Sequence, residues 1–156
     1  DGDTPLMIAA INDAPECIAL LLEKGAHLHA KNKEGRSAVH YAARHKSPHS
    51  LKLLLERGAE VDAVDEDGDT PLIIAAIEDA PKCIALLLEK GAHLHAKNKE
   101  GRSAVHYAAL HNSPRSLELL ERGARTVAVL ASRVLQDDQG TLSAAAASES
   151  PPDAKR

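Results

Sequence analysis

The sequence predicts an all-α fold, a solenoid of stacked helix-turn-helix units that are joined by extended β-turn loops. The run "CIALLLEKGAHLHAKNKEGRSAVHYAA" occupies residues 17–43 and returns unchanged at 83–109. Similar phrases begin at four glycines that are each 33 residues apart: Gly2, Gly35, Gly68 and Gly101. Every unit also carries the start signals of two short helices. A fixed period of this length is typical of repeat proteins in which each unit contacts only its neighbours.

The first helix of each unit is expected directly after a hydroxyl side chain. Thr4-Pro5 and Thr70-Pro71 read as an N-cap followed by proline at the first helical position. Ser37 and Ser103 supply the same hydroxyl at the equivalent places. The helix that follows is short and rich in alanine, which lets a neighbouring unit approach closely.

The second helix of each unit is expected to begin at a proline, at Pro15 and its equivalents. Ile18, Leu21 and Leu22 show the i, i+3, i+4 spacing of a buried stripe. Gly25 then ends the helix, because glycine adopts a left-handed C-terminal cap without strain. The residues after it, "AHLHAKNKEG", read as an extended segment and a turn that lead to the next cap.

Composition limits the classes of function. Apolar residues make up 44% of the 156 residues, with two tyrosines and neither Phe nor Trp, so the core must be aliphatic. The net charge of −4 argues against nucleic-acid binding. Membrane insertion is not expected, because no apolar run approaches about 18 residues. Cys17 and Cys83 read as buried free thiols, which favours an intracellular, cytoplasmic location. No signal peptide is visible, and a start at Asp1 indicates a piece of a longer gene product or a trimmed form.

These motifs resemble the ankyrin repeat family. The resemblance is carried by "GDTPLMIAA", by "CIALLLEKGA" and by the 33-residue period. It covers residues 1–124 as four repeats, 1–33, 34–66, 67–99 and 100–124. The second and fourth repeats depart from the family pattern, because they have "SAVH" in place of Thr-Pro-Leu-His.

The last repeat and the residues after it look less regular. "SLELLERGA" lacks one leucine of the earlier "SLKLLLERGA". A deletion of one residue turns everything after it by about 100° around a helix. We therefore expect the second helix of the fourth repeat to be shortened or frayed. A capping helix is possible over 125–136, and 137–156 has the composition of a disordered tail.

The histidines are the best candidates for metal ligands. Two histidines at i, i+2 on an extended segment point the same way, as in His27 and His29. A zinc site needs three or four ligands, however, and the equivalent pair lies two repeats away, about 20 Å by helix packing. A stacked polar row of His29, Asp62 and His95 is the preferred interpretation, with pH sensing left open.

The sequence indicates that the chain is not an enzyme. No serine or cysteine has a plausible base and orienting partner, and "KNKEGRS" has a single glycine and is not a phosphate loop. We expect no catalytic residue, no cofactor and no bound metal. The family resemblance implies that His40 and His106 make structural hydrogen bonds between repeats.

Charge is banded along the chain. The loop 31–36 is mostly basic, the loop 60–69 is acidic, the loop 97–102 is basic again, and Asp1 and Asp3 are acidic. Neighbouring bands can pair within the molecule, although such exposed pairs are worth only about 0–1 kcal/mol each. They can also select a partner.

The resemblance implies that a partner binds the loop tips and the outward side of the first helices. Ile77 and Leu110, if exposed, are the natural apolar anchors. The matching residues are Lys33, Glu34, Arg36, Arg44, His45, Glu66, Asp67, Asp69, Ile77, Glu78, Lys99, Glu100, Arg102, Leu110 and His111.

The sequence therefore predicts a non-catalytic protein–protein interaction module that is a monomer in isolation. Two alternatives stay open. The chain can be the regulatory array of a larger enzyme or channel whose active domain lies outside it. It can also be a structural spacer without a dedicated partner.

Overall fold

The fold is that of a computed structural model in which residues 1–125 are described. The inner helices are α1 (Pro5–Ile11), α3 (Ala38–Arg44), α5 (Pro71–Ile77) and α7 (Ala104–Leu110). The outer helices are α2 (Pro15–Glu23), α4 (Pro48–Glu56) and α6 (Pro81–Glu89), and residues 114–125 are helical in the same position of the last repeat. The described residues contain no β-strand. The predicted all-α solenoid is thereby confirmed.

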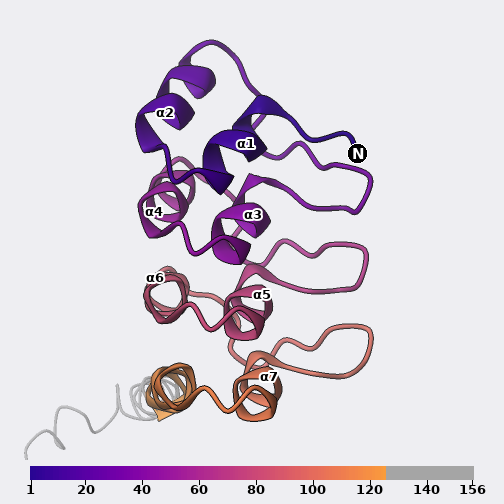
Figure 1. Cartoon of the computed structure of the whole chain (residues 1–156), viewed down its shortest axis with the longest axis vertical. Coiled ribbons are helices and arrows are strands. Elements are labelled where there is room, and N and C mark those ends of the chain that lie inside the picture. Colours follow the sequence, from indigo (N-terminus) through magenta and orange to yellow (C-terminus); the bar gives the residue numbers. More distant parts are fainter. Residues whose placement is uncertain (126–156) are drawn as a thin grey trace, which may run out of the picture. The chain divides into compact units, whose positions relative to one another are not determined.

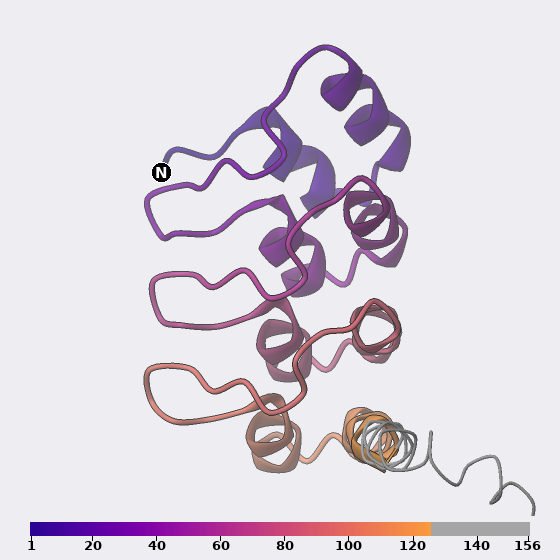
Figure 2. The same cartoon turned by 180° about the vertical axis from the view of Figure 1, so that it is seen from behind.

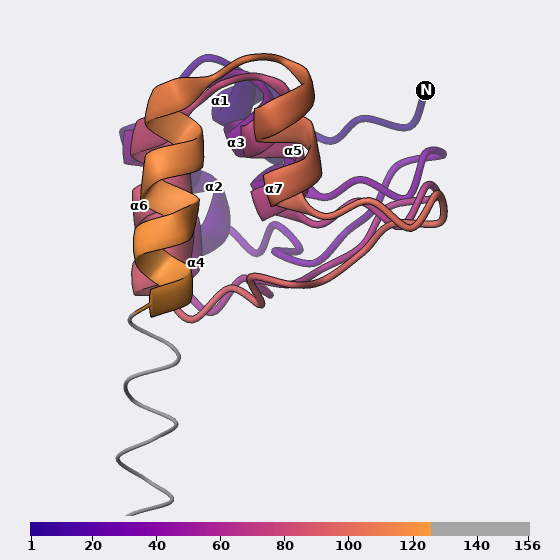
Figure 3. The same ribbon diagram turned by 90° about the horizontal axis from the view of Figure 1, so that it is seen from below.

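The helices form two parallel rows. Figure 1 shows the inner helices stacked in one column and the outer helices in a second, with long loops projecting from the inner side. The view from behind in Figure 2 and the view along the stack in Figure 3 show these loops projecting together in one direction. Residues Asp1–Glu121 form one compact unit. We number the repeats by their helix pairs, from α1–α2 to α7 with 114–125.

The predicted threonine, proline and glycine signals of the helices act as expected. The Thr4 hydroxyl accepts a hydrogen bond from the backbone N–H of Met7 at 3.3 Å, and the Thr70 hydroxyl accepts one from Ile73 at 3.2 Å. Each of the outer helices α2, α4 and α6 begins at its proline. The glycine after each of these helices adopts a positive φ, as at Gly58 with φ 97°.

The core lies between the two rows and between successive repeats. The alanines of the inner helices are buried throughout α3 and α5, and each inner helix contacts the next one in the stack. From the outer row, Leu51, Leu54, Ile84 and Leu87 are completely buried. Small side chains on the inner helices and aliphatic ones on the outer helices therefore form one continuous core.

The expected shortening of the last outer helix is wrong. Residues 114–125 are helical up to the end of the described range. Leu54 of the second repeat aligns with Leu120 of the fourth. The leucine that the fourth repeat lacks corresponds to Leu55, so the deletion lies after this buried position. Ser116 and Leu120 therefore keep their register and are buried. Because helical hydrogen bonds are made by the backbone, the deletion changes which side chains face the core and leaves the helix intact.

The two cysteines differ in burial. Cys83 is buried against repeat 2, and burial raises the pKa of its thiol to about 11. Cys17 is exposed, contrary to expectation, because no repeat packs over the first one in the described chain. Both are free thiols.

The predictions at the C-terminal end fall largely outside the described residues. The possible capping helix at 125–136 lies there except for Arg125, and the predicted tail at 137–156 lies there entirely. Within residues 1–125, no helix combines the length and the apolar character that crossing a membrane requires.

Candidate partner-binding surface

Each projecting loop is organised by one buried side chain at its base. We call residues 32–36, 65–69 and 98–102 the tip loops. The Asn32 side-chain oxygen accepts hydrogen bonds from the backbone N–H groups of Glu34 and Arg36, at 2.9 and 3.0 Å. Asp65 and Asn98 make the same pair of bonds in their own loops, at 2.9–3.0 Å. The turn at each tip is therefore fixed by an internal acceptor and needs no partner to form.

The two asparagines also connect their tip loops to neighbouring elements. The Asn32 amide nitrogen donates to Asp3 at 2.7 Å and to the Tyr41 hydroxyl at 2.8 Å. Asn98 repeats this arrangement with Asp69 at 2.8 Å and the Tyr107 hydroxyl at 2.9 Å. An acidic residue of the preceding loop and the tyrosine of the inner helix are thus held by one amide.

The middle tip loop uses a different connection, because Asp65 has no N–H to donate. Its second carboxylate oxygen instead accepts a hydrogen bond from Arg36 Nε at 3.4 Å. Arg36 also contacts Glu34 at 3.1 Å. The contact between Arg36 and Asp65 connects the basic loop 31–36 to the acidic loop 60–69, so the charge bands pair within the molecule at this place.

Backbone hydrogen bonds join successive tips. Lys33 N–H donates to the carbonyl of Asp1 at 3.1 Å, Glu66 N–H to that of Glu34 at 3.0 Å, and Lys99 N–H to that of Asp67 at 3.0 Å. The tips accordingly lie side by side along the stack, as Figures 1 and 2 show. Their charges are held in a fixed order.

The predicted partner-binding residues of the tip loops fall into two groups. Arg36 and Asp69 are half-buried and are used in the loop contacts described above. Burial, reinforced by the carboxylates of Asp65 and Asp67, raises the pKa of Asp69. The remaining predicted tip residues are exposed: Lys33, Glu34, Glu66, Asp67, Lys99, Glu100 and Arg102.

The other predicted residues stand at the ends of the inner helices. Leu110 is 65% exposed at the end of α7, whereas Ile77 at the end of α5 is half-buried. His45 and His111 are exposed and stack on Tyr41 and Tyr107, with ring centroids 6.1 and 6.3 Å apart.

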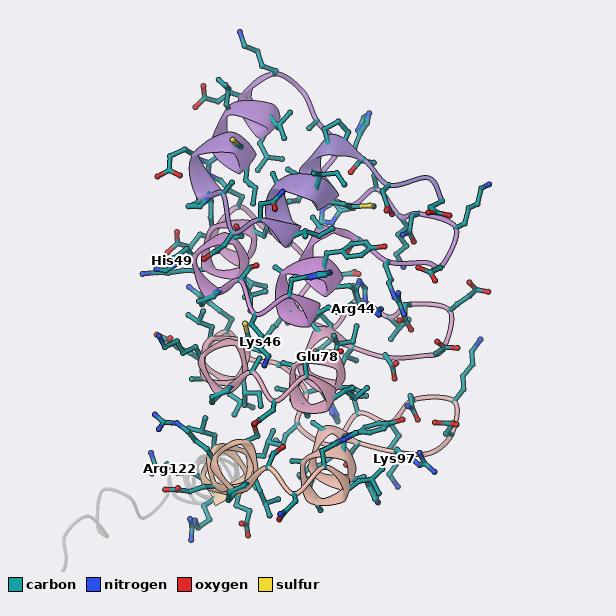
Figure 4. The ribbon with its side chains drawn as sticks, viewed as in Figure 1. Arg44, Lys46, His49, Glu78, Lys97 and Arg122 are labelled. Atoms are coloured by element: carbon teal, nitrogen blue, oxygen red, sulfur yellow. The ribbon has the colours of Figure 1, made fainter. Side chains whose placement is uncertain are left out.

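Two charged residues among the predicted ones also lie at the ends of inner helices. Arg44 is exposed and Glu78 is half-buried, and Figure 4 labels both at the ends of adjacent inner helices. Of the two expected apolar anchors, Leu110 is therefore freely accessible.

The histidine pairs after the outer helices do not form a shared cluster. His27, His29, His93 and His95 are all exposed. In place of the expected polar row, the Asp62 carboxylate accepts a hydrogen bond from the backbone N–H of His93 at 2.9 Å.

Within residues 1–125, the one group of three potential ligands with atoms within 4.8 Å of one another is Asp65, Asp67 and Asp69. The carboxylates of Asp65 and Asp69 accept the loop hydrogen bonds given above, and Asp67 donates its backbone N–H to Asp65, which accounts for the proximity of the three residues.

His40 has a structural role, but within one repeat rather than between repeats. Its Nδ1 accepts a hydrogen bond from the Ser37 N–H at 3.0 Å, so the ring proton lies on Nε2 and is donated to the Ala63 carbonyl at 2.9 Å. His106 Nδ1 accepts the Ser103 N–H in the same way, at 3.0 Å. Burial lowers the pKa of His40, opposed by Asp65. The lowered pKa and the acceptor role of Nδ1 both favour the neutral ring in the folded chain at neutral pH.

Acidification should weaken the fold through His40. As the pH falls below about 6.5, the unfolded chain binds a proton at this position before the folded chain does. Stability should then decrease by up to about 1.4 kcal/mol per pH unit until the lowered pKa is passed. Urea unfolding at several pH values measures this slope. His40→Gln should flatten it, whereas His95→Gln, at an exposed site, should not. Parallel curves for all three proteins would contradict the assignment.

Sequence reasoning missed the residues that build the tip loops. Asn32, Asp65, Asn98, Tyr41 and Tyr107 were not among the predicted site residues, yet all are buried and hydrogen-bonded there. A signal was present, because Asn, Asp and Asn recur at the 33-residue period just before each tip. Short polar side chains at such positions favour turns by bonding their own backbone.

Comparison with known proteins agrees with this geometry. A search of curated proteins returned no significant match. The family model described as "Ankyrin repeats (3 copies)" matches residues 1–65 and again residues 58–129. Together these matches include both helix rows and all three tip loops. The chain belongs to the ankyrin repeat family.

Proposed function

We propose that this chain is a non-catalytic module that binds a protein partner through its tip loops and the ends of its inner helices. Ankyrin repeats are generally protein–protein interaction modules. The observation that carries the proposal is the construction of the tips. Buried Asn and Asp side chains fix each turn from within, while the charged residues beside them stay exposed. A surface that is already ordered loses little conformational entropy when it binds.

Charge order supplies the selectivity of this surface. The exposed tips carry Lys33 and Glu34, then Glu66 and Asp67, then Lys99 and Glu100. The middle tip is therefore acidic between two mixed tips. Each exposed ion pair with a partner adds little affinity, but a partner with a basic residue opposite the middle tip is favoured over one with an acidic residue.

Leu110 supplies the apolar contact. It is the most exposed large apolar side chain among the described residues, at 65%. It stands beside His111, which stacks on Tyr107. Apolar side chains that become buried on binding, surrounded by a polar rim, are common in protein interfaces. We place Arg44, His45, Ile77 and Glu78 in the same interface, with Arg36, Asp69 and Arg102 supporting the tips.

We further propose a cytoplasmic location. Its support is the pair of free thiols, one of which is exposed, since exposed free cysteines persist best in a reducing compartment.

The test reverses charge at the middle tip alone. Asp65 and Asp69 are excluded because they hold the loop together, so the variant is Glu66→Lys with Asp67→Lys. Capture with crosslinking identifies a partner, and calorimetry then measures its affinity for each protein. The variant should bind at least about tenfold more weakly, with the fold unchanged by circular dichroism.

A matched control carries the same charge change elsewhere. Glu56→Lys with Glu89→Lys alters two exposed residues at the ends of outer helices, away from the tips. Its affinity should equal that of the unchanged chain. Equal affinity of both variants would refute the tip surface, whereas failure to capture any specific partner would favour a structural spacer.

A further inference from the structure

A polar pocket lies at the junction of the second and third tip loops. It has a volume of about 270 Å³. Two of its lining residues come from the middle tip loop, and the others come from the loop 98–102 and from α7: Asp67, Asp69, Asn98, Lys99, Glu100 and Tyr107. The Lys99 N–H donates to the Asp67 carbonyl at 3.0 Å, so the two loops that form the pocket are joined by their backbones.

Three carboxylates line this pocket. Oxygens of Asp67 and Asp69 lie within 4.8 Å of each other. Asp69 uses its Oδ1 to accept the Asn98 amide at 2.8 Å, which leaves Oδ2 for another donor. Glu100 supplies the third carboxylate, and its Oε1 accepts the Tyr107 hydroxyl at 3.1 Å. The pocket therefore offers several negatively charged acceptors in a small space.

The cations beside the pocket do not pair with its two aspartates. Arg102 contacts Glu100 at 3.6 Å, and its guanidinium lies 5.8 Å from the centre of the Tyr107 ring. Lys99 is exposed and, within residues 1–125, makes no ion pair. Burial, reinforced by the neighbouring carboxylates, raises the pKa of Asp69. A further positive charge at this place would relieve the repulsion between the aspartates.

The chain itself shows which cation suits an acidic tip. Arg36 Nε donates to Asp65 of the middle tip loop at 3.4 Å, and Arg102 lies over the Tyr107 ring. A guanidinium donates to two carboxylate oxygens at once and also packs on aromatic rings, whereas an ammonium is a point charge. A divalent metal ion is a poorer occupant, because it needs about six oxygen ligands and oxygens of Asp65 and Asp69 already accept loop hydrogen bonds.

We propose that this pocket receives an arginine side chain of the protein partner, whose guanidinium donates to Asp67 and Asp69 beside Glu100. This inference rests on the proposed function, since it names the residue that the partner presents to the middle tip. It adds a specific chemistry to the charge order, because a fork of donors is distinguished from a simple positive charge.

The test uses a minimal probe, the N-acetyl methylamide of arginine, which is titrated into the isotope-labelled chain at low salt and followed by NMR. The amide signals of Asp67, Asp69 and Glu100 should shift together, with a dissociation constant near about 10 mM. The citrulline derivative has the same shape without the charge and should bind at least about threefold more weakly, as should the lysine derivative.

A variant of the chain locates the binding. Asp67→Asn with Glu100→Gln removes two charges from the pocket while keeping the shapes of the side chains, and it should weaken the arginine probe at least about threefold. Glu56→Gln with Glu89→Gln removes two charges at the ends of outer helices and should leave the shifts unchanged. Circular dichroism should show the same fold for both variants.

Three results would overturn the arginine pocket. They are absence of shifts at these amides up to about 50 mM probe, equal binding of the arginine and citrulline or lysine derivatives, and displacement of the probe by about 1 mM calcium chloride, which would indicate a metal site. The probe experiment needs no partner. Failure of the probe, with partner affinity still lost on charge reversal at the middle tip, removes the pocket and keeps the tip surface. Unchanged partner affinity on that charge reversal removes the tip surface itself.

Discussion

Leu54→Ala should lower the free energy of unfolding by about 2–5 kcal/mol. Leu54 is completely buried in α4, and this helix contacts α2, α3 and α6. Truncation removes apolar atoms from the junction of three repeats and leaves a cavity that none of the three can close alone. Because each repeat is covered only by its neighbours, damage in the middle of the stack weakens the contacts on both sides.

Urea unfolding followed by circular dichroism measures this loss. Leu20→Ala is the matched control, since Leu20 is the same residue type on an outer helix but is 56% exposed. It should change stability by no more than about 0.5 kcal/mol, as should Lys33→Ala at an exposed tip. If the two leucine variants lost the same stability, the core would not lie between the repeats as the structure has it.

The helices were predictable from the sequence because their signals are local. A hydroxyl before a proline, a proline at each outer helix and a glycine after it act within one turn of the chain. The period of 33 residues then made the stacking predictable, because a helix pair cannot bury its apolar face alone. Deletion of one leucine was misleading for the opposite reason. The effect of the deletion on the helix depends on whether the missing residue comes before or after the buried Leu120, and the sequence alone does not show which leucine is buried.

The tip loops were predictable as charged projections, but their internal bonds were not. Asn32 contacts Asp3 and Tyr41, which are 29 and 9 residues away, and Asp65 contacts Arg36, which is 29 residues away. Such contacts follow from the spacing of stacked repeats, which sequence patterns do not specify in detail. The exposure of Cys17 was missed similarly, since its buried equivalent Cys83 has a nearly identical local sequence and is packed against the preceding repeat.

Gly35→Ala should destabilise the chain more than Gly58→Ala, although both glycines have a positive φ. Gly35 has φ 74° and Gly58 has φ 97°, so an alanine at either position carries backbone strain of about 1–2 kcal/mol. The surroundings differ. A Cβ at Gly35 would lie 2.9 Å from the backbone nitrogen of Glu66, whereas a Cβ at Gly58 would meet nothing within 4 Å. Only the first variant must push two tip loops apart.

That separation also breaks a hydrogen bond. The Glu66 N–H donates to the Glu34 carbonyl at 3.0 Å, directly beside the new methyl group. Gly35→Ala should therefore lose about 1–3 kcal/mol more than Gly58→Ala in urea unfolding, since overpacking against backbone is not relieved by a change of rotamer. Amide hydrogen exchange at Glu66 should accelerate in Gly35→Ala and stay unchanged in Gly58→Ala. Equal losses in both variants would mean that strain at the glycine alone sets the effect, and the tips would then not be held together by their close backbone contact.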